Sequence, residues 1–599
     1  MSEFQQASGL DEPVVVALPH LPTPQKIIGR ASVIAPGVVE EFRGIPYATV
    51  PGRWRHSVLR TGLPNDNFYA VNNGPQCPQP PQYATSNSFQ SHLDWPENVG
   101  ESEFDCLNLF IVRPSASCLR SAGVDKWEDV KLPVYLNIHG GGFGWGAGTD
   151  PMWDPTRLVM RSITEGNPLI AVTINYRLGI FGMGFCSDMI VGQEEANELQ
   201  GGNFGLGDQR IAMRWVTQNI AAFGGDPDKV TISGQSAGAV GVHAHILEAK
   251  FGTKPPLFRR AIQQSGALRT MVPMKVEEAD QKWSKLYDRL GVIDKAPKDR
   301  LKVLLDMTAA ELLDVAISLG WLTWHPVEDA LTIHACPSGG WRVFLGQRED
   351  LHEQQKPAPK DPIYILIGDC EDECGLVENV TRLRSFAEIK ELFNSCVPPV
   401  PQAAIDELLA AYELTPSCSL PEAHRNLSKF MSDRQFSYPV EDARREFAST
   451  LYMHKKMPRN IESAIRTEIR PYRFKCGNPF PGPRHNVAHH SVEFIYTHDC
   501  FHGDLARRDC IEESSGLRLL GQASNLSLVS QVQKWWVDFI TNDTVYGDEN
   551  TATVIDVDRR LYIRDISKDG NWAAMIARMN VVGRHFDDAT KIWHSIRTM

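Results

Sequence analysis

The chain has 599 residues, of which 42% are hydrophobic and 22% charged, and its net charge is −12. This length and composition suffice for a large buried core, and the negative charge argues against a nucleic-acid partner, because phosphate binding depends on clustered Lys and Arg. The 12 cysteines are spread from Cys77 to Cys510 and show no compact disulfide framework.

The first residues of the chain are acidic and polar. They include neither a basic start nor a continuous apolar segment before a cleavage site, as a secretory signal would. Later apolar runs, at 132–138 and 169–174, are too short to span a bilayer. We therefore expect a cytoplasmic protein without a membrane span, in which residues 1–25 form an N-terminal extension. A secreted protein whose signal peptide had been removed would begin in the same way.

The first motif follows the apolar run 132–138, which is typical of a buried parallel strand. The run continues into His139 and three glycines, Gly140, Gly141 and Gly142. In acyl transfer the attacked carbonyl becomes an oxyanion, and backbone N–H groups without obstructing side chains can stabilise it. Considered alone, the loop is either such an oxyanion hole or a flexible turn.

The second motif lies at 230–241, where a β-branched run is followed by Gly-Gln-Ser-Ala-Gly and then by small helix-forming residues. A sharp strand-to-helix turn that exposes a serine hydroxyl needs small residues on both flanks. Ser236 is therefore the candidate nucleophile. A chance match would explain this motif alone, but not both motifs in the expected order.

Short motifs occur in a fixed order over most of the chain. Besides the two above they are Phe42-Arg-Gly-Ile-Pro-Tyr-Ala48, Asp105-Cys-Leu-Asn-Leu109, Asn175-Tyr-Arg-Leu-Gly179, Gly202-Asn-Phe-Gly-Leu-Gly-Asp-Gln209 and Ala261-Ile-Gln-Gln-Ser-Gly266. This series resembles the type-B carboxylesterase/lipase family, which includes the cholinesterases, and is most similar to its intracellular fungal carboxylesterases. The resemblance implies an α/β-hydrolase fold, with a large, mostly parallel central sheet flanked by helices.

The motifs are spread so widely that a cut through the middle would separate the serine from the other catalytic residues. We therefore expect a single α/β domain at 26–599. Two segments, near 275–320 and 381–415, are rich in helix formers with Leu at helical spacing, and they predict helical excursions over the active site.

The family's orienting acid is a glutamate in a loop after a strand. The apolar run that begins at Pro362 ends in an acidic turn, in which Glu373 lies five positions after Gly368. The resemblance assigns the acid to Glu373, with Glu371 and Asp372 as alternatives. The family's glycine after the acid is Cys374 in this chain.

The family's general base lies in a segment that resembles 486–496, with a glutamate three residues after the histidine. This spacing selects His490, three residues before Glu493, and leaves His489 and His502 as alternatives. The chain order Ser, acid, His is that of the fold.

These residues predict ester hydrolysis without a metal or organic cofactor. His490 would take the proton of Ser236, and Glu373 would fix the imidazole tautomer. By resemblance, the oxyanion donors are the backbone N–H groups of Gly141, Gly142 and Ala237.

The resemblance also implies contacts around the site. It predicts a buried or semi-buried Arg177–Asp208 ion pair and a hydrogen-bonded network behind the triad that includes Ser265 and Glu493. It places Cys77 and Cys106 close together, where secreted relatives often form a disulfide.

The expected partner is a small-molecule ester. Gln235 replaces the glutamate that cholinesterases carry before the serine, so a negative charge is absent and a neutral, apolar ester or lactone is favoured. Phe143, Trp145 and Trp324 are candidate pocket walls, with core packing as the alternative for each. The sequence leaves open whether the protein is a monomer or a homodimer.

The sequence is also compatible with two other functions. The same triad could carry out acyl transfer, lactonisation or a base-catalysed elimination in secondary metabolism, the last without Ser236. A non-catalytic, cholinesterase-like binding protein is the other alternative, but such proteins typically lose the serine that this chain retains.

Overall fold

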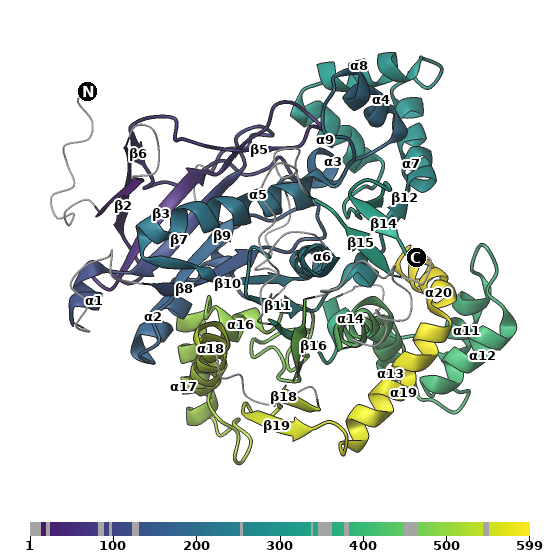
Figure 1. Cartoon of the computed structure of the whole chain (residues 1–599). Coiled ribbons are helices and arrows are strands. Elements are labelled where there is room, and N and C mark those ends of the chain that lie inside the picture. Colours follow the sequence, from purple (N-terminus) through teal and green to yellow (C-terminus); the bar gives the residue numbers. More distant parts are fainter. Residues whose placement is uncertain are drawn as a thin grey trace.

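The computed structural model describes most of the chain (Figure 1). The described residues are 14–18, 24–81, 89–94, 99–121, 131–251, 256–336, 340–345, 362–376, 382–448, 465–542 and 550–598. Residues 1–13 and 19–23 of the expected N-terminal extension lie outside this set. The remaining part of that extension contains β1, which pairs with β2 at the edge of the main sheet.

A 13-stranded sheet forms the centre of the molecule. Its order is β1-β2-β3-β7-β9-β8-β10-β11-β16-β17-β18-β19, and β6 pairs with β2. The strands are β1 (Val14–Leu18), β2 (Gln25–Ala31), β3 (Val39–Pro46), β6 (Asn67–Tyr69), β7 (Asn108–Pro114), β8 (Leu132–Ile138), β9 (Ile170–Ile174), β10 (Gly225–Gln235), β11 (Arg260–Gln264), β16 (Ile363–Cys370), β17 (Thr467–Phe474), β18 (Thr551–Ile555) and β19 (Leu561–Asp565).

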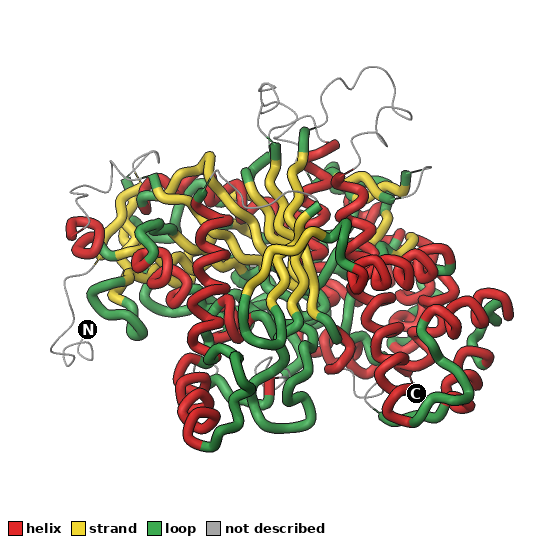
Figure 2. The backbone as a smooth tube through the Cα atoms, turned by 90° about the horizontal axis from the view of Figure 1, so that it is seen from below, coloured by secondary structure: helices red, strands yellow, loops and turns green. Residues whose placement is uncertain are grey.

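Neighbouring strands are parallel throughout the stretch from β9 to β18. The path from β1 to β9 and the pair β18–β19 are antiparallel, whereas β6 pairs with β2 in parallel. The central strands are buried on both faces, as parallel strands covered by helices must be. Figure 2 shows these strands crossing the middle of the molecule between layers of helix. The large parallel sheet that the sequence predicts is confirmed.

Helices cover both faces of the sheet. The helices of the described segments are α1 (Ala116–Ser121), α2 (Thr156–Thr164), α3 (Gly179–Gly182), α4 (Ser187–Glu195), α5 (Phe204–Asn219), α6 (Ala237–Phe251), α7 (Val276–Arg289), α8 (Pro297–Asp306), α9 (Ala309–Ser318), α11 (Phe386–Asn394), α12 (Gln402–Ala411), α13 (Leu420–Ser432), α14 (Tyr438–Ala448), α16 (Phe494–Thr497), α17 (His502–Ser514), α18 (Asn525–Thr541), α19 (Gly570–Arg584) and α20 (Phe586–Thr598).

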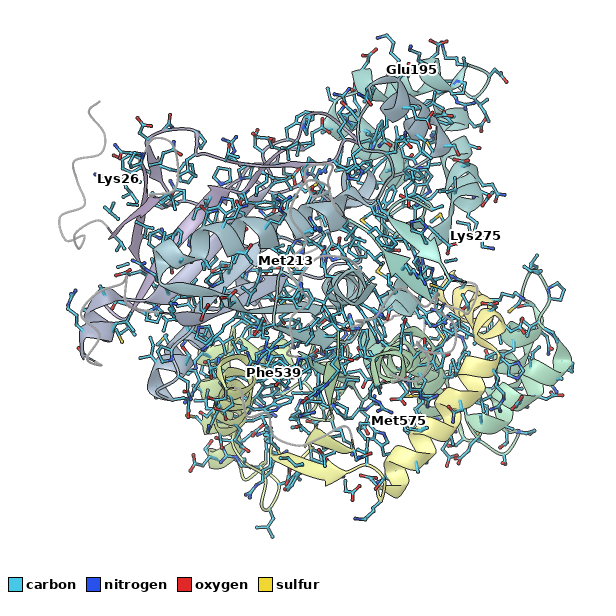
Figure 3. All side chains as sticks on the ribbon, in the orientation of Figure 1. Lys26, Glu195, Met213, Lys275, Phe539 and Met575 are labelled. Carbon is cyan, nitrogen blue, oxygen red and sulfur yellow. The ribbon has the colours of Figure 1, made fainter. Side chains whose placement is uncertain are left out.

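Two apolar cores lie on the two faces. In β11, Ala261 belongs to one core and its neighbour Ile262 to the other, because successive side chains of a strand point to opposite faces. Helices α5 and α6 contribute to the first core, and α2 and α18 to the second. Met213 of α5 and Phe539 of α18, both labelled in Figure 3, are buried on these two faces.

A third core lies beside the end of β16. It is built from α11, α12, α13, α19 and α20, and it includes Cys374, the residue after the candidate acid. Figure 1 shows these helices gathered at one end of the molecule. Helices α11 and α12 occupy the expected excursion at 381–415, and α7, α8 and α9 occupy the one at 275–320. Within the described ranges, no helix combines the length and the apolar character needed to cross a membrane.

The predicted Arg177–Asp208 ion pair is confirmed. Nε and Nη2 of Arg177 donate to the two oxygens of Asp208, each at 2.8 Å, and the backbone N–H of Arg177 donates to the same carboxylate at 3.1 Å. Both side chains are almost completely buried. The pair ties the chain after β9 to the start of α5.

We predict that Asp208→Asn lowers the free energy of unfolding by about 3–5 kcal/mol, because it leaves the Arg177 guanidinium buried without a balancing charge. Urea unfolding measures the change. Asp306→Asn is the matched control, since it breaks the exposed Lys302–Asp306 pair and should leave the free energy of unfolding nearly unchanged. Equal losses in the two variants would contradict a structural role for the buried pair.

Candidate active site

Ser236 lies in the sharp turn between β10 and α6. Its backbone has a φ of 56°, in the left-handed region that non-glycine residues rarely adopt. The turn needs its glycines: a Cβ at Gly234 would lie 2.3 Å from the Gly238 carbonyl, and a Cβ at Gly238 would lie 2.1 Å from the Ile138 oxygen. The backbone N–H of Ser236 donates to the Gln264 oxygen at 2.9 Å, which fixes the turn against β11.

The glycine loop lies directly beside this turn. A Cβ at Gly140 would lie 3.3 Å from Cβ of Ser236. Gly141 and Gly142 have φ values of 105° and 59°, and a Cβ at Gly141 would lie 2.0 Å from the Trp145 oxygen. Within the part of the chain that the structure describes, the N–H groups of Gly141, Gly142 and Ala237 donate to no other protein group. They are therefore available to a ligand.

Glu373 and His490 are in contact. Nδ1 of His490 donates to Oε2 of Glu373 at 2.5 Å, and the backbone N–H of Cys370 donates to Oε1 at 2.7 Å. Glu373 begins a short 3₁₀ helix, Glu373–Leu376, immediately after β16, and it is 1% exposed. Because the carboxylate accepts from Nδ1, the lone pair of the neutral imidazole is on Nε2.

The alternative acids and bases have other partners. Glu371 is exposed and lies 3.8 Å from Lys475, and Asp372 accepts a hydrogen bond from Ser428. Nε2 of His489 contacts Asn478, and burial lowers the pKa of His489 to about 4. His502 pairs with Asp499. Of the candidate pairs, the structure brings Glu373 and His490 together.

Two positions where the family has glycine are filled differently. Ser491 has a φ of 69°, so it occupies a backbone conformation that glycine adopts without strain. Cys374 is fully buried in the third core, and its N–H donates to Ser432 at 2.9 Å. The structure thus accommodates both substitutions without separating the acid from the base.

A second buried carboxyl lies behind Glu373. Oε2 of Glu493 accepts from Sγ of Cys370 at 2.8 Å, and Oε1 accepts from Gln264 at 3.5 Å. Burial, together with the negative charge of Glu373, raises the pKa of Glu493 to about 7. The expected role of Ser265 is not seen, because its hydroxyl makes no hydrogen bond among the described residues.

Phe436 stacks on the imidazole of His490, a contact that the sequence analysis missed. The ring centroids are 4.3 Å apart and the planes are inclined by 31°. Phe436 lies in a π-helical turn, Asp433–Ser437, between α13 and α14. Such turns are frequent at functional sites, but they have no sequence signature that would have indicated this one.

The candidate wall residues differ in exposure. Phe143 is fully buried and packs on Tyr176, whereas Trp145 is partly exposed and its ring would lie 3.4 Å from a Cβ at Gly142. Trp324 is buried, and its backbone N–H donates to the Gly142 oxygen at 2.9 Å. Nζ of Lys282 lies 3.8 Å from the centre of the Trp324 ring. These contacts attach the segment around Trp324 to the glycine loop.

The cysteine contact is confirmed. Cys77 and Cys106 are both buried and free, and the nearby Cys77 thiol is the largest cause that raises the pKa of Cys106. No group of three or more His, Cys, Asp or Glu side chains in the described segments has an arrangement that could hold a metal ion.

Comparison with known proteins identifies the family. The model of the Carboxylesterase family matches residues 19–578. The chain belongs to the carboxylesterase family. This membership confirms the resemblance seen in the sequence, and the chain is a carboxylic ester hydrolase.

Curated relatives cover different shares of the chain. Lipase 3 of Yarrowia lipolytica is 28% identical over 81% of this chain and 84% of its own length. The para-nitrobenzyl esterase of Bacillus subtilis is 35% identical over 47% of this chain and 50% of its own length. The inactive carboxylesterase-like protein VdtD of Byssochlamys spectabilis is 35% identical over 63% of this chain and 60% of its own length.

Solved structures agree on the fold. A structure of PNB esterase superposes with a TM-score of 0.62 at 23% identity and covers 94% of this chain and 99% of its own. A thermophilic PNB esterase gives a TM-score of 0.61 with the same coverage. The α/β-hydrolase fold of this family member is therefore established.

We predict that Phe436→Leu lowers kcat/KM about fivefold. When His490 takes a proton it becomes an imidazolium, and the face of an aromatic ring stabilises a cation by about 0.5–2 kcal/mol. Steady-state hydrolysis of a p-nitrophenyl ester measures the loss. Phe104→Leu, at an exposed position, is the control. An unchanged kcat/KM in the Phe436 variant would show that the stacking does not assist proton transfer.

We also predict that Glu493→Gln stabilises the protein increasingly as pH rises from 4.5 to about 7. The pKa of Glu493 is raised from 4.5 to about 7 by folding, so the native state retains a proton that the unfolded state loses above pH 4.5. The wild type therefore loses stability across this window, whereas glutamine, which mimics the protonated form, does not. Thermal unfolding at several pH values tests this. Exposed Glu277→Gln is the control, and a difference that does not vary with pH would refute the assignment.

Proposed function

We propose that this carboxylesterase acts through an acyl-enzyme on Ser236, with His490 as general base and Glu373 as orienting acid. The 2.5 Å contact between Glu373 and His490, beside the turn that presents Ser236, carries the proposal. The alternatives among the neighbouring acids and histidines are engaged elsewhere.

The chemistry follows from the arrangement. Nε2 of His490 removes the proton of Ser236 as Oγ attacks the ester carbonyl, and Glu373 stabilises the imidazolium that forms. His490 then gives the proton to the leaving alcohol, which leaves the acyl group on Ser236. Water, activated by the same imidazole, releases the acid.

The oxyanion of each tetrahedral intermediate would be bound by the N–H groups of Gly141, Gly142 and Ala237. Two facts support this: the glycine loop lies beside the nucleophile, and these donors have no protein partner among the described residues. Donors that are already oriented contribute more in a buried site than in water.

The proposed substrate is a neutral, apolar ester or lactone. Gln235 replaces a carboxylate next to the nucleophile, and the partly exposed Phe436 ring adds an apolar surface beside His490. Similarity to a lipase and to a para-nitrobenzyl esterase is consistent with this class. The cytoplasmic location and the choice between monomer and homodimer remain predictions.

The similarity to a relative described as inactive keeps the non-hydrolytic alternative open. Acyl transfer and lactonisation would still use Ser236, whereas a base-catalysed elimination would need only His490 and Glu373. Removal of the serine hydroxyl therefore separates elimination from ester chemistry.

We predict that Ser236→Ala lowers kcat for p-nitrophenyl esters by on the order of 10⁶, as in serine hydrolases whose nucleophile is removed. A fluorophosphonate should label Ser236 of the wild type, detected by mass spectrometry, and should not label the variant. Ser284→Ala, at an exposed position on α7, is the control. Turnover that survives in Ser236→Ala would contradict the acyl-enzyme.

A further inference from the structure

The nitrogen of His490 that must receive the serine proton already makes a hydrogen bond with another side chain. Nε2 of His490 lies 2.9 Å from Nε2 of Gln235. Because Nδ1 donates to Glu373, Nε2 is an acceptor, and the Gln235 amide is its donor. The hydroxyl of Ser236 makes no hydrogen bond among the described residues. In this structure the base is therefore bound to Gln235 and not to the nucleophile.

The position of Gln235 explains the contact. It is the last residue of β10, one residue before Ser236, and it is 2% exposed. A Cβ at Gly140 would lie 2.9 Å from Oε1 of Gln235 and 2.7 Å from its backbone oxygen, so the carboxamide uses the space that glycine leaves. The side chain thus extends from beneath the glycine loop to the imidazole.

We propose that Gln235 is a positioning residue that caps Nε2 of His490 in the resting enzyme and releases it to Ser236 when substrate binds. The exchange breaks the hydrogen bond from the Gln235 amide and forms one from the Ser236 hydroxyl, with no change in covalent bonds. This inference rests on the proposed function and deepens it by naming a substrate class.

The substrate class follows from the acceptor that the Gln235 amide needs once it has released His490. A buried N–H that loses its acceptor is costly, and a plain hydrocarbon acyl chain offers no replacement. An ester or lactone whose acyl part has a second carbonyl oxygen can accept the hydrogen bond from Gln235. The enzyme should therefore prefer such keto esters or diesters over hydrocarbon esters of the same shape.

The cap also affects protonation of the base. An amide N–H that points at Nε2 stabilises neutral His490 and opposes the imidazolium, whose Nε2 would itself be a donor. The other titratable groups around this imidazole are Glu373, in direct contact, and the neighbouring Glu493 and His489. These groups are the same in every Gln235 variant, so a change in pH profile reports the cap.

The first experiment compares p-nitrophenyl 4-oxopentanoate with p-nitrophenyl pentanoate, which have the same chain length. In the wild type we expect kcat/KM to favour the keto ester about tenfold. Gln235→Met, similar in size but without a donor, should abolish most of this preference and move the acid limb of the pH–rate profile to higher pH. Gln235→Glu should move it further, because a carboxylate stabilises the imidazolium. An unchanged preference and pH profile in Gln235→Met would overturn the proposal.

The second experiment measures the cap without catalysis. In a Ser236→Ala background, and at a pH above the acid limb of the Gln235→Met profile, diethyl pyrocarbonate should modify His490 about fivefold faster when Gln235 is methionine, because the Nε2 lone pair is free. His502, with a 42% exposed side chain, is the internal reference in the same digest. Equal rates would refute the cap even if the wild type hydrolyses esters. Faster modification in a protein without esterase activity would support the cap and refute the proposed function.

Thermal unfolding shows whether replacing the buried Gln235 has itself destabilised the protein. If Gln235→Met does not fold, Gln235→Glu supplies the test with the opposite sign. Its carboxylate should hold His490 protonated and slow the modification relative to the Ser236→Ala parent. An unchanged rate in that variant would count against the cap.

Discussion

The contact between Glu373 and His490 is the interaction on which the site depends. The acid follows β16, whereas the base follows β17, more than a hundred residues later in the chain. The parallel pairing of β16 with β17 brings the two ends to the same edge of the sheet, beside the turn after β10. A buried carboxylate needs donors, and the N–H groups of Cys370 and His490 supply them.

Two further buried carboxyl groups, Asp369 and Glu493, lie behind this contact, and their raised pKa values reduce the negative charge that they add. Burial raises the pKa of Asp369 to about 6, and Arg473 pairs with it at 2.6 Å. No Lys or Arg among the described residues pairs with Glu493, and its raised pKa keeps a proton close to the site near neutral pH. Of these three buried carboxyl groups, Glu373 is the one that, among the described residues, accepts a hydrogen bond from His490. This arrangement lets one carboxylate orient the base while its neighbours add little repulsion.

The sequence predicts most of the central sheet and its helices, and part of the active site. The strand at 132–138, the glycine loop and the Ser236 turn were predictable because each depends on local backbone geometry. Glu373 and His490 came from the resemblance, since their meeting depends on strand order that no local pattern contains. The contacts of Gln235 and Phe436 with His490 were not predictable. One depends on a side-chain conformation, and the other on a π-helical turn set by packing between α13 and α14.

The third apolar core has a consequence for biosynthesis. Cys374, next to the acid, packs in one cluster with Ile592 and Trp593 of α20, a helix that is translated long after β16. The third core, which packs beside the acid, is therefore incomplete until α20 has been translated. The serine, the glycine loop and the acid are therefore all translated before the helix that packs beside the acid, and the complete site requires α20.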